Sequence, residues 1–433
     1  MMDRRRFLFW TGSAFAASSV IAGCDGTQSA PEMAGDDWSE VRSQFNLAAD
    51  EIDLSAMFIT SHPKPVREAI ERYRQQLDES PTFYLREHLN SKEREVLQSA
   101  ADYLNANPAE IALTDSTTMG LGLIYNGLTL LPGQQIITTE HDYYATHESL
   151  RLAAARTGAE IREIRLYERE DTVTADEIVT NLTNSIEPAT RVIALTWVHS
   201  STGLKLPLRQ IADAVAGINA ERQEQQKILV CVDGVHGFGV EATGVPETGC
   251  DFFIAGCHKW LFGPRGTGII WGNERAWAAV RPTIPTFMDD EVRNAWMLDR
   301  NPPGRTSARS MTPGGFKAFE HQWALAEAFK FHLAIGKDKI ANRTYELNRL
   351  CKEGLAGMSH VKLYTPMDEA LSSGIVCFDV QGMSPREVVG KLRRRNVIAT
   401  TTPYAQSHAR LSPSVRNSPQ EIEFTLQAIR DLG

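Results

Sequence analysis

An acidic and a basic side chain follow two successive apolar runs of the chain. Asp233 ends the run "KILVCVD", and Lys259 comes two residues after the run "DFFIAGC". If both runs are parallel strands, the two side chains reach the same edge of a sheet, where open α/β sheets bind ligands. A lysine among apolar residues loses solvation, so its pKa falls and its neutral amine can attack a carbonyl group. The pair therefore predicts covalent amine chemistry, against the alternatives of a turn-capping aspartate and a lysine that reaches solvent.

A cofactor that carries an aldehyde would use both side chains. Pyridoxal 5′-phosphate forms a Schiff base with a lysine, and an aspartate keeps its pyridine nitrogen protonated, so that the ring draws electrons. The stretch "LTDSTTMGLGL" offers a cradle for the phosphate, because a helix start presents free backbone N–H groups to anions. The hydroxyls of Ser116, Thr117 and Thr118 would assist there, although an ordinary helix cap explains the same residues. His258, beside the lysine, is a further candidate donor.

The elements that must position these residues alternate along the chain. Helical spacing of apolar residues predicts helices over 65–77 and 117–131. Short apolar runs rich in Ile, Val and Phe lie at 110–116, 134–140, 160–167, 191–198, 227–233, 251–257 and 266–272. Such nearly continuous apolar strands with helical connections predict an α/β fold, in which helices cover both faces of a mostly parallel sheet.

The last third of the chain has a different order of elements. A long helix is predicted from residue 316, followed by a strand at 374–380, a helix at 384–395, a strand at 396–402 and a final helix. This order suits a smaller α+β domain. A length of 433 residues agrees with two domains.

The N-terminus has the layout of an export signal, with a basic start, a modest apolar run and small residues at its end. Arg4 and Arg5 resemble a twin-arginine signature, and Cys24 follows a lipobox-like "IAG". We expect residues 1–23 to be a signal peptide and 24–40 a linker, with lipidation at Cys24. The expected location is the periplasm or cell envelope, and the alternatives are a plain cleaved signal or an uncleaved anchor.

The bulk composition excludes several classes of partner. The net charge is −9 and no basic run follows residue 6, so nucleic acid is not expected. No apolar run is long enough for a membrane-spanning helix, which leaves the lipid on Cys24 as the expected membrane contact. Cys231, Cys257 and Cys377 lie inside apolar runs and are expected to be buried hydrophobes rather than disulfide partners. No spacing of Cys and His indicates a metal site.

Together the motifs resemble the class V aminotransferase superfamily of fold-type I pyridoxal-phosphate enzymes. The resemblance extends from about residue 45 to 430, is strongest to the isopenicillin-N-epimerase-like branch and is more distant to cysteine desulfurases. It implies a large domain over 41–315 with a mostly parallel seven-stranded sheet, and a smaller α+β domain over 316–433 on which the N-terminal part also packs. The motifs are "TDSTTMGL", "TEHDYYA", "WVHSSTGLKLPL", "DGVHGFG", "AGCHKWLFGPRGTG", "MTPGGF" and "RLSPSVRNSPQEIE".

The resemblance assigns roles around the cofactor ring. Lys259 matches the Schiff-base lysine and Asp233 the partner of the pyridine nitrogen. His141 falls where an aromatic ring stacks on the cofactor and assists proton transfer, with Tyr143 as the alternative. The remaining ring contacts implied are His236 near the ring hydroxyl and Ser200 near the ring oxygen.

The resemblance also assigns contacts to the phosphate and the substrate. Thr117, Thr118 and His258 fall at phosphate contacts. Thr312 matches a residue that reaches the phosphate of a neighbouring subunit, which implies a homodimer. Arg410 matches the arginine that pairs with a substrate carboxylate, a task that suits the guanidinium fork.

Two departures from the family pattern bear on function. The stretch 397–412 lacks the nucleophilic cysteine of cysteine desulfurases, which argues against persulfide chemistry. Gly256 replaces a serine, so one phosphate contact must come from elsewhere. We expect an aminotransferase acting on an amino acid or related amine. The alternatives are an epimerase or a C–S/β-lyase and, less favoured, an inactive envelope binding protein; the substrate and the amino acceptor stay open.

Overall fold

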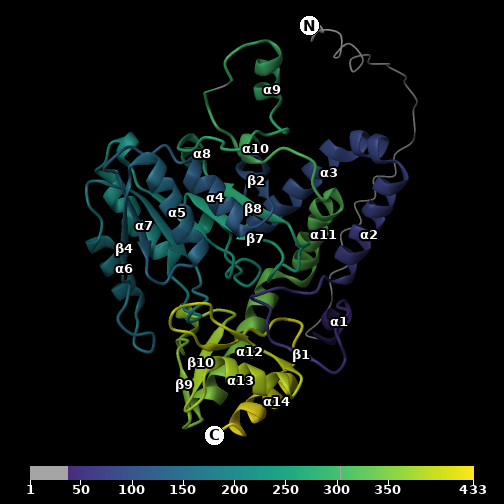
Figure 1. Cartoon of the computed structure of the whole chain (residues 1–433), viewed down its shortest axis with the longest axis vertical. Helices are drawn as coiled ribbons and strands as arrows, with labels where there is room; N and C mark the ends of the chain where they lie inside the picture. The colour runs from purple at the N-terminus through teal and green to yellow at the C-terminus, as the bar shows by residue number, and fades with distance from the viewer. Residues whose placement is uncertain (1–37, 303) are drawn as a thin grey trace. The chain divides into compact units, whose positions relative to one another are not determined.

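The computed structural model describes residues 38–302 and 304–433 (Figure 1). The predicted signal peptide, Cys24 and the linker up to residue 37 lie outside the described residues. Helix α1 (Trp38–Ser43) begins within the last part of the segment predicted as linker. None of the described helices combines the length and apolar character needed to cross a membrane.

A seven-stranded, mostly parallel sheet forms the large domain, as predicted. Strand β8 is antiparallel to both of its neighbours, and the other neighbouring pairs are parallel. Adjacent strands in the sheet are, in order, β2 (Ile111–Thr114), β8 (Gly268–Gly272), β7 (Phe252–Gly256), β6 (Leu229–Asp233), β5 (Thr190–Thr196), β3 (Gln135–Thr139) and β4 (Glu160–Ile164).

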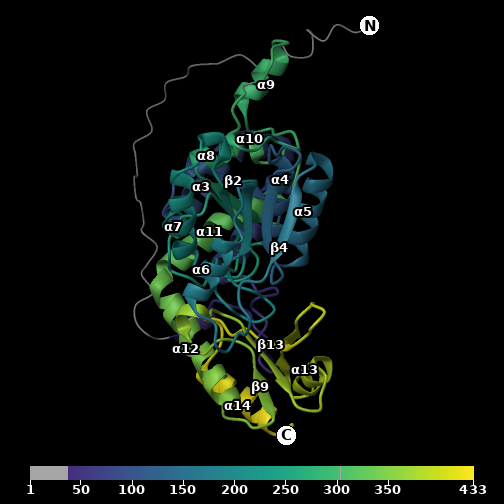
Figure 2. The same ribbon diagram turned by 90° about the vertical axis from the view of Figure 1, so that its left-hand side faces the viewer.

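Helices cover both faces of this sheet. Successive strand residues point to opposite sides, so each face presents apolar side chains that need covering. In β6, Val230 and Val232 belong to one apolar cluster, and Leu229 and Cys231 belong to another. The first cluster includes residues of α3 (Pro81–Leu104), α6 (Ala175–Asn184), α7 (Leu208–Ala220) and α11 (Phe319–Ile335). The second includes residues of α4 (Thr117–Gly127), α5 (Tyr144–Thr157), α8 (Glu274–Ala278) and α10 (Ala308–Met311). Figure 2 shows α4 and α5 on one side of the strands and α7 and α11 on the other.

The helix predicted over 117–131 is shorter than its apolar spacing indicated. It ends at Gly127, and Leu128 turns away to form a bridge with Val280. A side chain at position 127 would place its Cβ 2.7 Å from the Arg281 carbonyl oxygen. The chain therefore leaves the helix to pair with a distant segment, and Leu131 is 64% exposed rather than part of a helical face.

A four-stranded antiparallel sheet forms the smaller C-terminal domain, drawn in yellow-green in Figure 1. The first of the described strands, β1 (Ile52–Asp53), pairs in parallel with β11 (Val397–Ile398). The sheet order is β12 (Thr400–Thr401), β13 (Ala409–Leu411), β10 (Val376–Val380) and β9 (Val361–Leu363). Its helices are α12 (Lys337–Ala356), α13 (Pro385–Arg393) and α14 (Pro419–Arg430).

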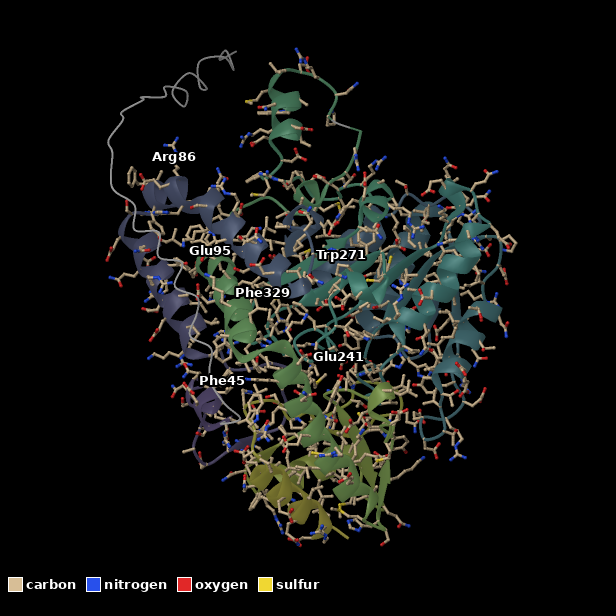
Figure 3. All side chains as sticks on the ribbon, turned by 180° about the vertical axis from the view of Figure 1, so that it is seen from behind. Phe45, Arg86, Glu95, Glu241, Trp271 and Phe329 are labelled. Atoms are coloured by element: carbon tan, nitrogen blue, oxygen red, sulfur yellow. The ribbon has the colours of Figure 1, made fainter. Side chains whose placement is uncertain are left out.

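The long helix α11 packs mainly on α2 (Lys64–Glu79) and α3. Its Phe329 joins the apolar cluster of the large sheet, and Lys330 forms an ion pair with Glu95 of α3 at 2.6 Å. Figure 3 labels Glu95 and Phe329 where the two helices meet. The following helix, α12, instead contributes Leu347 and Cys351 to the apolar cluster of the small sheet. Helix α9 (Asp290–Met297) has no buried residue.

Candidate active site

Lys259 and Asp233 lie at the same edge of the large sheet. Strands β6 and β7 are parallel neighbours, Asp233 closes β6, and Lys259 lies in the turn after β7. Burial raises the pKa of Asp233 to about 6, and the nearby Lys259 charge opposes this shift. Burial lowers the pKa of Lys259 to about 8, and Asp233 opposes that shift in turn. The two side chains are therefore close enough to interact, as adjacent parallel strands predict.

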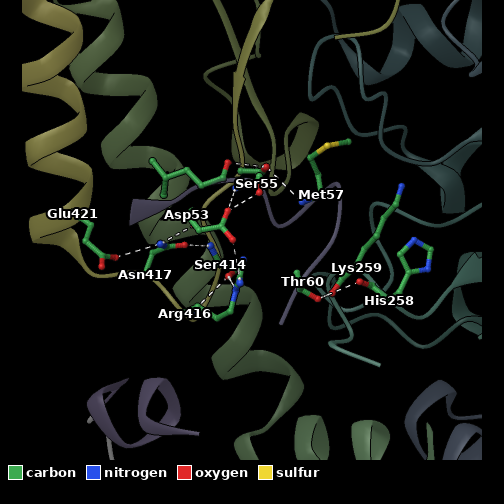
Figure 4. A network of polar contacts seen from close by, with 12 residues as sticks. Asp53, Ser55, Met57, Thr60, His258, Lys259, Ser414, Arg416, Asn417 and Glu421 are labelled. Carbon is green, nitrogen blue, oxygen red and sulfur yellow. Dashed lines mark hydrogen bonds and ion pairs between the residues drawn. The ribbon is translucent and has the colours of Figure 1, made fainter. Parts of the chain in front are cut away.

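The backbone of the Lys259 turn is held by a residue that sequence reasoning missed. The Thr60 hydroxyl lies 2.8 Å from the Lys259 carbonyl oxygen and 3.1 Å from that of His258 (Figure 4). The Thr60 N–H also donates to the His258 carbonyl at 3.3 Å. Because Thr60 is nearly 200 positions away in the chain, no local pattern pointed to it. These bonds fix the point from which the lysine side chain extends.

The predicted phosphate cradle lies at the start of α4. Ser116 caps this helix in an extended conformation, and its hydroxyl accepts from the Met119 N–H at 3.1 Å. The Thr117 hydroxyl accepts from the Gly256 N–H at 2.8 Å, which leaves its own hydrogen free to donate to an anion. Thr118 is exposed in the first turn. First-turn N–H groups lack partners within a helix, so this end can receive a phosphate.

Gly256, the departure from the family pattern, has a structural explanation. A Cβ at this position would lie 3.0 Å from the Thr117 hydroxyl oxygen and 3.2 Å from the His258 ring. The missing side chain therefore lets the end of β7 approach the start of α4. Thr117 and His258 occupy the space beside the cradle that a serine would otherwise enter.

The two predicted histidines near the lysine are both neutral at pH 7. Burial, followed by the Lys259 charge, lowers the pKa of His258 to about 4. Burial also lowers the pKa of His236 well below its ordinary value. His236 is 5% exposed, and its Nδ1 has no hydrogen-bond partner among the described residues. An unpartnered buried nitrogen next to Lys259 fits a polar group of the cofactor ring.

His141 and Tyr143, the alternatives for covering the cofactor ring, occupy different environments. His141 is partly buried, and its ring lies parallel to that of Tyr167, with centroids 4.2 Å apart. Burial lowers the pKa of His141. Tyr143 is 38% exposed and packs edge-on to Tyr404, with centroids 6.1 Å apart. Only His141 belongs to a stack of buried rings.

Asp142 anchors the segment that carries both rings, and the sequence reasoning did not single it out. It is 1% exposed, and its Oδ2 accepts from the Thr139 N–H at 2.7 Å and the Thr138 hydroxyl at 2.8 Å. Its Oδ1 accepts from the Thr196 N–H at 2.7 Å. One carboxylate thus ties the ends of β3 and β5 together. Its place in "TEHDYYA", next to His141, was the available signal.

Arg410 reaches the site from β13 of the small domain. It is 3% exposed and donates to the Ser200 carbonyl at 2.8 Å, the Thr400 hydroxyl at 3.0 Å and the Thr401 carbonyl at 3.3 Å. No carboxylate pairs with it in the described part of the chain. Ser200 also meets Tyr404, whose hydroxyl lies 2.8 Å from the serine Oγ. Neither Tyr404 nor its contact with Ser200 was predicted.

Thr312 lies inside the large domain. It is 5% exposed, and its hydroxyl accepts from the Leu113 N–H at 3.1 Å while facing the Ala308 carbonyl at 3.5 Å. In the single chain this hydroxyl holds β2 against α10. Its predicted contact with the phosphate of a neighbouring subunit stays a prediction.

The comparisons with known proteins agree with this geometry. The family model for aminotransferase class-V matches residues 59–418, so the chain belongs to this family. The isopenicillin N epimerase of Amycolatopsis lactamdurans is 24% identical over 405 residues, which cover 92% of this chain and 98% of that protein. A cysteine desulfurase of Klebsiella pneumoniae is 29% identical over 295 residues, which cover 66% of each chain.

Solved structures share the fold. A mutant of the C–S lyase C-DES, with glycine covalently linked to its PLP cofactor, aligns with a TM-score of 0.81 at 21% identity, covering 90% of this chain and 99% of that one. The apo cysteine desulfurase of Thermococcus onnurineus NA1 aligns with a TM-score of 0.78 at 20% identity, covering 91% and 97%. The predicted fold class and the predicted cofactor, pyridoxal 5′-phosphate, are confirmed. Among the described residues, no group of three or more His, Cys, Asp or Glu side chains could hold a metal ion.

Proposed function

We propose that the chain catalyses an aminotransferase-type reaction on a small molecule whose amino group is adjacent to a carboxylate. The main observation in favour is that Arg410 is buried and has no carboxylate partner among the described residues. It lies near the edge of the large sheet that holds Lys259 and Asp233. A guanidinium that has lost its hydration without gaining a carboxylate is suited to receive one from a ligand.

Each residue has a distinct task in this reaction. When bound, pyridoxal 5′-phosphate supplies a cationic ring that accepts the electrons of the substrate's Cα–H bond. Asp233 holds the proton on the pyridine nitrogen, and the start of α4 holds the phosphate. Arg410 orients the substrate carboxylate. The Lys259 amine, whose pKa is about 8, removes the α-proton as a general base. In transamination the same amine then delivers this proton to the cofactor instead of returning it to the α-carbon.

Epimerisation is the second candidate, and similarity to isopenicillin N epimerases across 92% of the chain favours it. It uses the same carbanion chemistry but requires a second acid on the opposite face of the substrate. His141 is the candidate for that acid.

A C–S or β-lyase reaction needs only a leaving group on the substrate. Persulfide chemistry is disfavoured, because the five described cysteines are all buried and none lies in 397–412.

A panel of amino acids tests these candidates on one sample of purified protein. We expect a visible absorbance band from the lysine-bound cofactor, bleached by borohydride, and transfer of the amino group from at least one amino acid to a keto acid. A racemised product without transfer would assign an epimerase, and release of sulfide or ammonia would assign a lyase. A colourless protein that gains no band with added cofactor would contradict the proposal and favour an inactive binding protein.

We also propose that the enzyme is an exported homodimer with a lipid at Cys24. Insertion of a cytoplasmic cofactor before export requires export of the folded protein, which the twin-arginine-like Arg4 and Arg5 support. Light scattering of the purified chain measures the dimer. Replacement of both arginines by lysine is expected to retain the protein in the cytoplasm, and Cys24→Ala is expected to release it from membranes.

A further inference from the structure

A cavity of about 440 Å³ lies where the parallel strands β5 and β6 begin, and we call it the β5–β6 cavity. The two strands start at this edge of the large sheet with Thr190 and Leu229, whereas Asp233 ends β6 at the opposite edge. Helix α8, which also lines the cavity, lies at the end of the large domain away from the small domain (Figure 1, Figure 2). A molecule bound here would not contact Lys259 or Arg410, so its binding is independent of the proposed function.

Apolar side chains form much of the wall of the β5–β6 cavity. The segment that follows α4 contributes Leu128, Leu130 and Leu131, and Leu131 is 64% exposed. The two strands contribute Val192 and Leu229. The volume falls within the range of small-molecule sites, and such a wall suits a ligand with an apolar body.

The charged residues of the wall are mostly basic. Arg191, Lys227 and Arg275 line the cavity, together with one acidic residue, Glu224. Lys227 pairs with Glu224 at 2.6 Å, and Arg275 pairs with Asp251 at 2.5 Å. No carboxylate pairs with Arg191 in the described part of the chain. One positive charge of the wall is therefore left without an acidic partner, although the net charge of the chain is −9.

The guanidinium of Arg191 has one unbonded edge. Its Nη1 donates to the carbonyls of Pro188 and Thr190 at 2.9 and 2.8 Å. Its Nε is buried without a hydrogen-bond partner, and none of the described residues accepts from its Nη2. Burial lowers the pKa of Arg191, and no acidic neighbour opposes this shift. The hydrogens of Nε and Nη2 lie side by side, in the geometry that receives both oxygens of a carboxylate.

We propose that the β5–β6 cavity binds an amphiphilic carboxylate, with its carboxylate on the Nε–Nη2 edge of Arg191 and its apolar body against the leucine side chains of the wall. A small carboxylate without an apolar body would bind weakly, because solvent screens the charge of a partly exposed arginine. An uncharged apolar molecule would leave the guanidinium edge unpaired. Only a ligand with both parts satisfies the apolar wall and the arginine together.

Isothermal titration calorimetry of the purified holoenzyme with sodium octanoate tests this proposal. We expect a single octanoate per chain with a Kd below about 1 mM. Acetate, which lacks the apolar body, and octanamide, which lacks the charge, are expected to give no measurable binding. Arg191→Met is expected to weaken octanoate binding at least about tenfold, because a charge-assisted bidentate contact is lost. Arg410→Met is expected to leave octanoate binding unchanged, which separates this cavity from the candidate active site.

Arg222 offers a matched control, because it donates to the carbonyls of Thr190 and Gln226 at 2.7 and 3.2 Å and does not line the cavity. Arg222→Met is expected to leave the Kd for octanoate unchanged. Ala278→Phe fills the cavity, keeps Arg191 and is expected to weaken binding, which tests the proposal even if Arg191→Met does not fold.

Circular dichroism establishes which of these variants are folded. Absence of octanoate binding to the wild type would overturn the proposal, as would unchanged binding in folded Arg191→Met or in Ala278→Phe. Equal binding of octanamide would show that the cavity does not select a carboxylate. Loss of octanoate binding in Arg410→Met would place the octanoate at the candidate active site instead.

Discussion

Two lysines of this protein share a lowered pKa but differ in what surrounds the ammonium group. Burial lowers the pKa of both Lys259 and Lys352 to about 8. Lys352 donates to the carbonyls of Pro366 and Met367 at 3.0 and 3.1 Å and to the Ser372 hydroxyl at 2.7 Å. The Lys259 ammonium has no hydrogen-bond partner among the described residues. Burial explains the pKa of both lysines, whereas the missing partners distinguish the one that can react.

Two buried arginines show the same contrast. Arg416 is 0% exposed and lies 3.4 Å from the Asp53 carboxylate and 3.3 Å from the Ser414 hydroxyl, in the network drawn in Figure 4. Arg410 is 3% exposed but faces only hydroxyl and carbonyl oxygens. The arginine that is paired with a carboxylate holds the fold together, and the arginine without a carboxylate marks the place proposed for a ligand.

The largest expected effect separates the two lysines. Lys259→Ala is expected to lower turnover by at least about 10³-fold, because the Schiff-base amine and the general base are lost together. Lys352→Ala is expected to retain the cofactor. Borohydride reduction followed by peptide mass spectrometry measures this, and cofactor trapped on any peptide without Lys259 would contradict the assignment.

Removal of the acid beside the cofactor is the next largest effect. Asp233→Ala is expected to lower the turnover number about 10²-fold, since the positive charge on the pyridine nitrogen loses its counter-charge. The absorbance band should remain, because Lys259 is unchanged. Steady-state kinetics combined with the visible spectrum checks this, and an unaltered turnover number would argue that Asp233 only caps the turn at Val235.

Substitutions of the two arginines are expected to affect different quantities, KM for Arg410 and the free energy of unfolding for Arg416. Arg410→Met is expected to raise KM for the amino acid about 10- to 100-fold, because a charge-assisted bond to the substrate carboxylate is lost. Arg416→Met is expected to leave KM unchanged and to lower the free energy of unfolding by about 3 kcal/mol, because Asp53 loses its buried partner. The reverse pattern, measured by kinetics and urea denaturation, would show that the two roles are exchanged.

A smaller effect concerns the stability of the cofactor-free protein. Lys352→Met is expected to lower the free energy of unfolding by about 1–3 kcal/mol, since three acceptors, two of them buried, lose their donor. Lys259→Met is expected to leave it unchanged or to raise it, because the amine is desolvated without a hydrogen-bond partner and the nearby Asp233 charge offsets only part of this cost. Urea denaturation of the two variants measures the difference, and equal losses would remove the distinction between them.

The pH dependence of cofactor uptake is the smallest effect. The reactive form of Lys259 is the neutral amine, which predominates above its pKa of about 8 and is replaced by the ammonium below it. The rate at which cofactor-free protein takes up pyridoxal 5′-phosphate should therefore rise about tenfold between about pH 7 and pH 9. Stopped-flow absorbance measures this rate. A rate that rises about 100-fold over this range and keeps rising to about pH 10 would mean that burial does not lower this pKa.

The elements of the large sheet could be predicted because their signal is local. Apart from the edge strand β4, which is mostly exposed, each strand is a run of four to seven residues with both faces buried, so the run itself is apolar. The nearness of Asp233 and Lys259 followed from adjacent parallel strands, whose ends share one edge. The end of α4 could not be predicted, because Leu128 leaves the helix to pair with Val280, far along the chain.

The sequence by itself determined the alternation of strands and helices and the residue types proposed to meet the cofactor, because periodicity and side-chain chemistry are properties of short segments. Only the tertiary structure decided which polar groups are completed by partners and which are left open. Thr60 at the Lys259 turn, Arg410 at Ser200 and Tyr167 at His141 depend on contacts between distant segments. Burial and hydrogen bonding arise only when these segments pack together, and they distinguish a reactive lysine from a structural one.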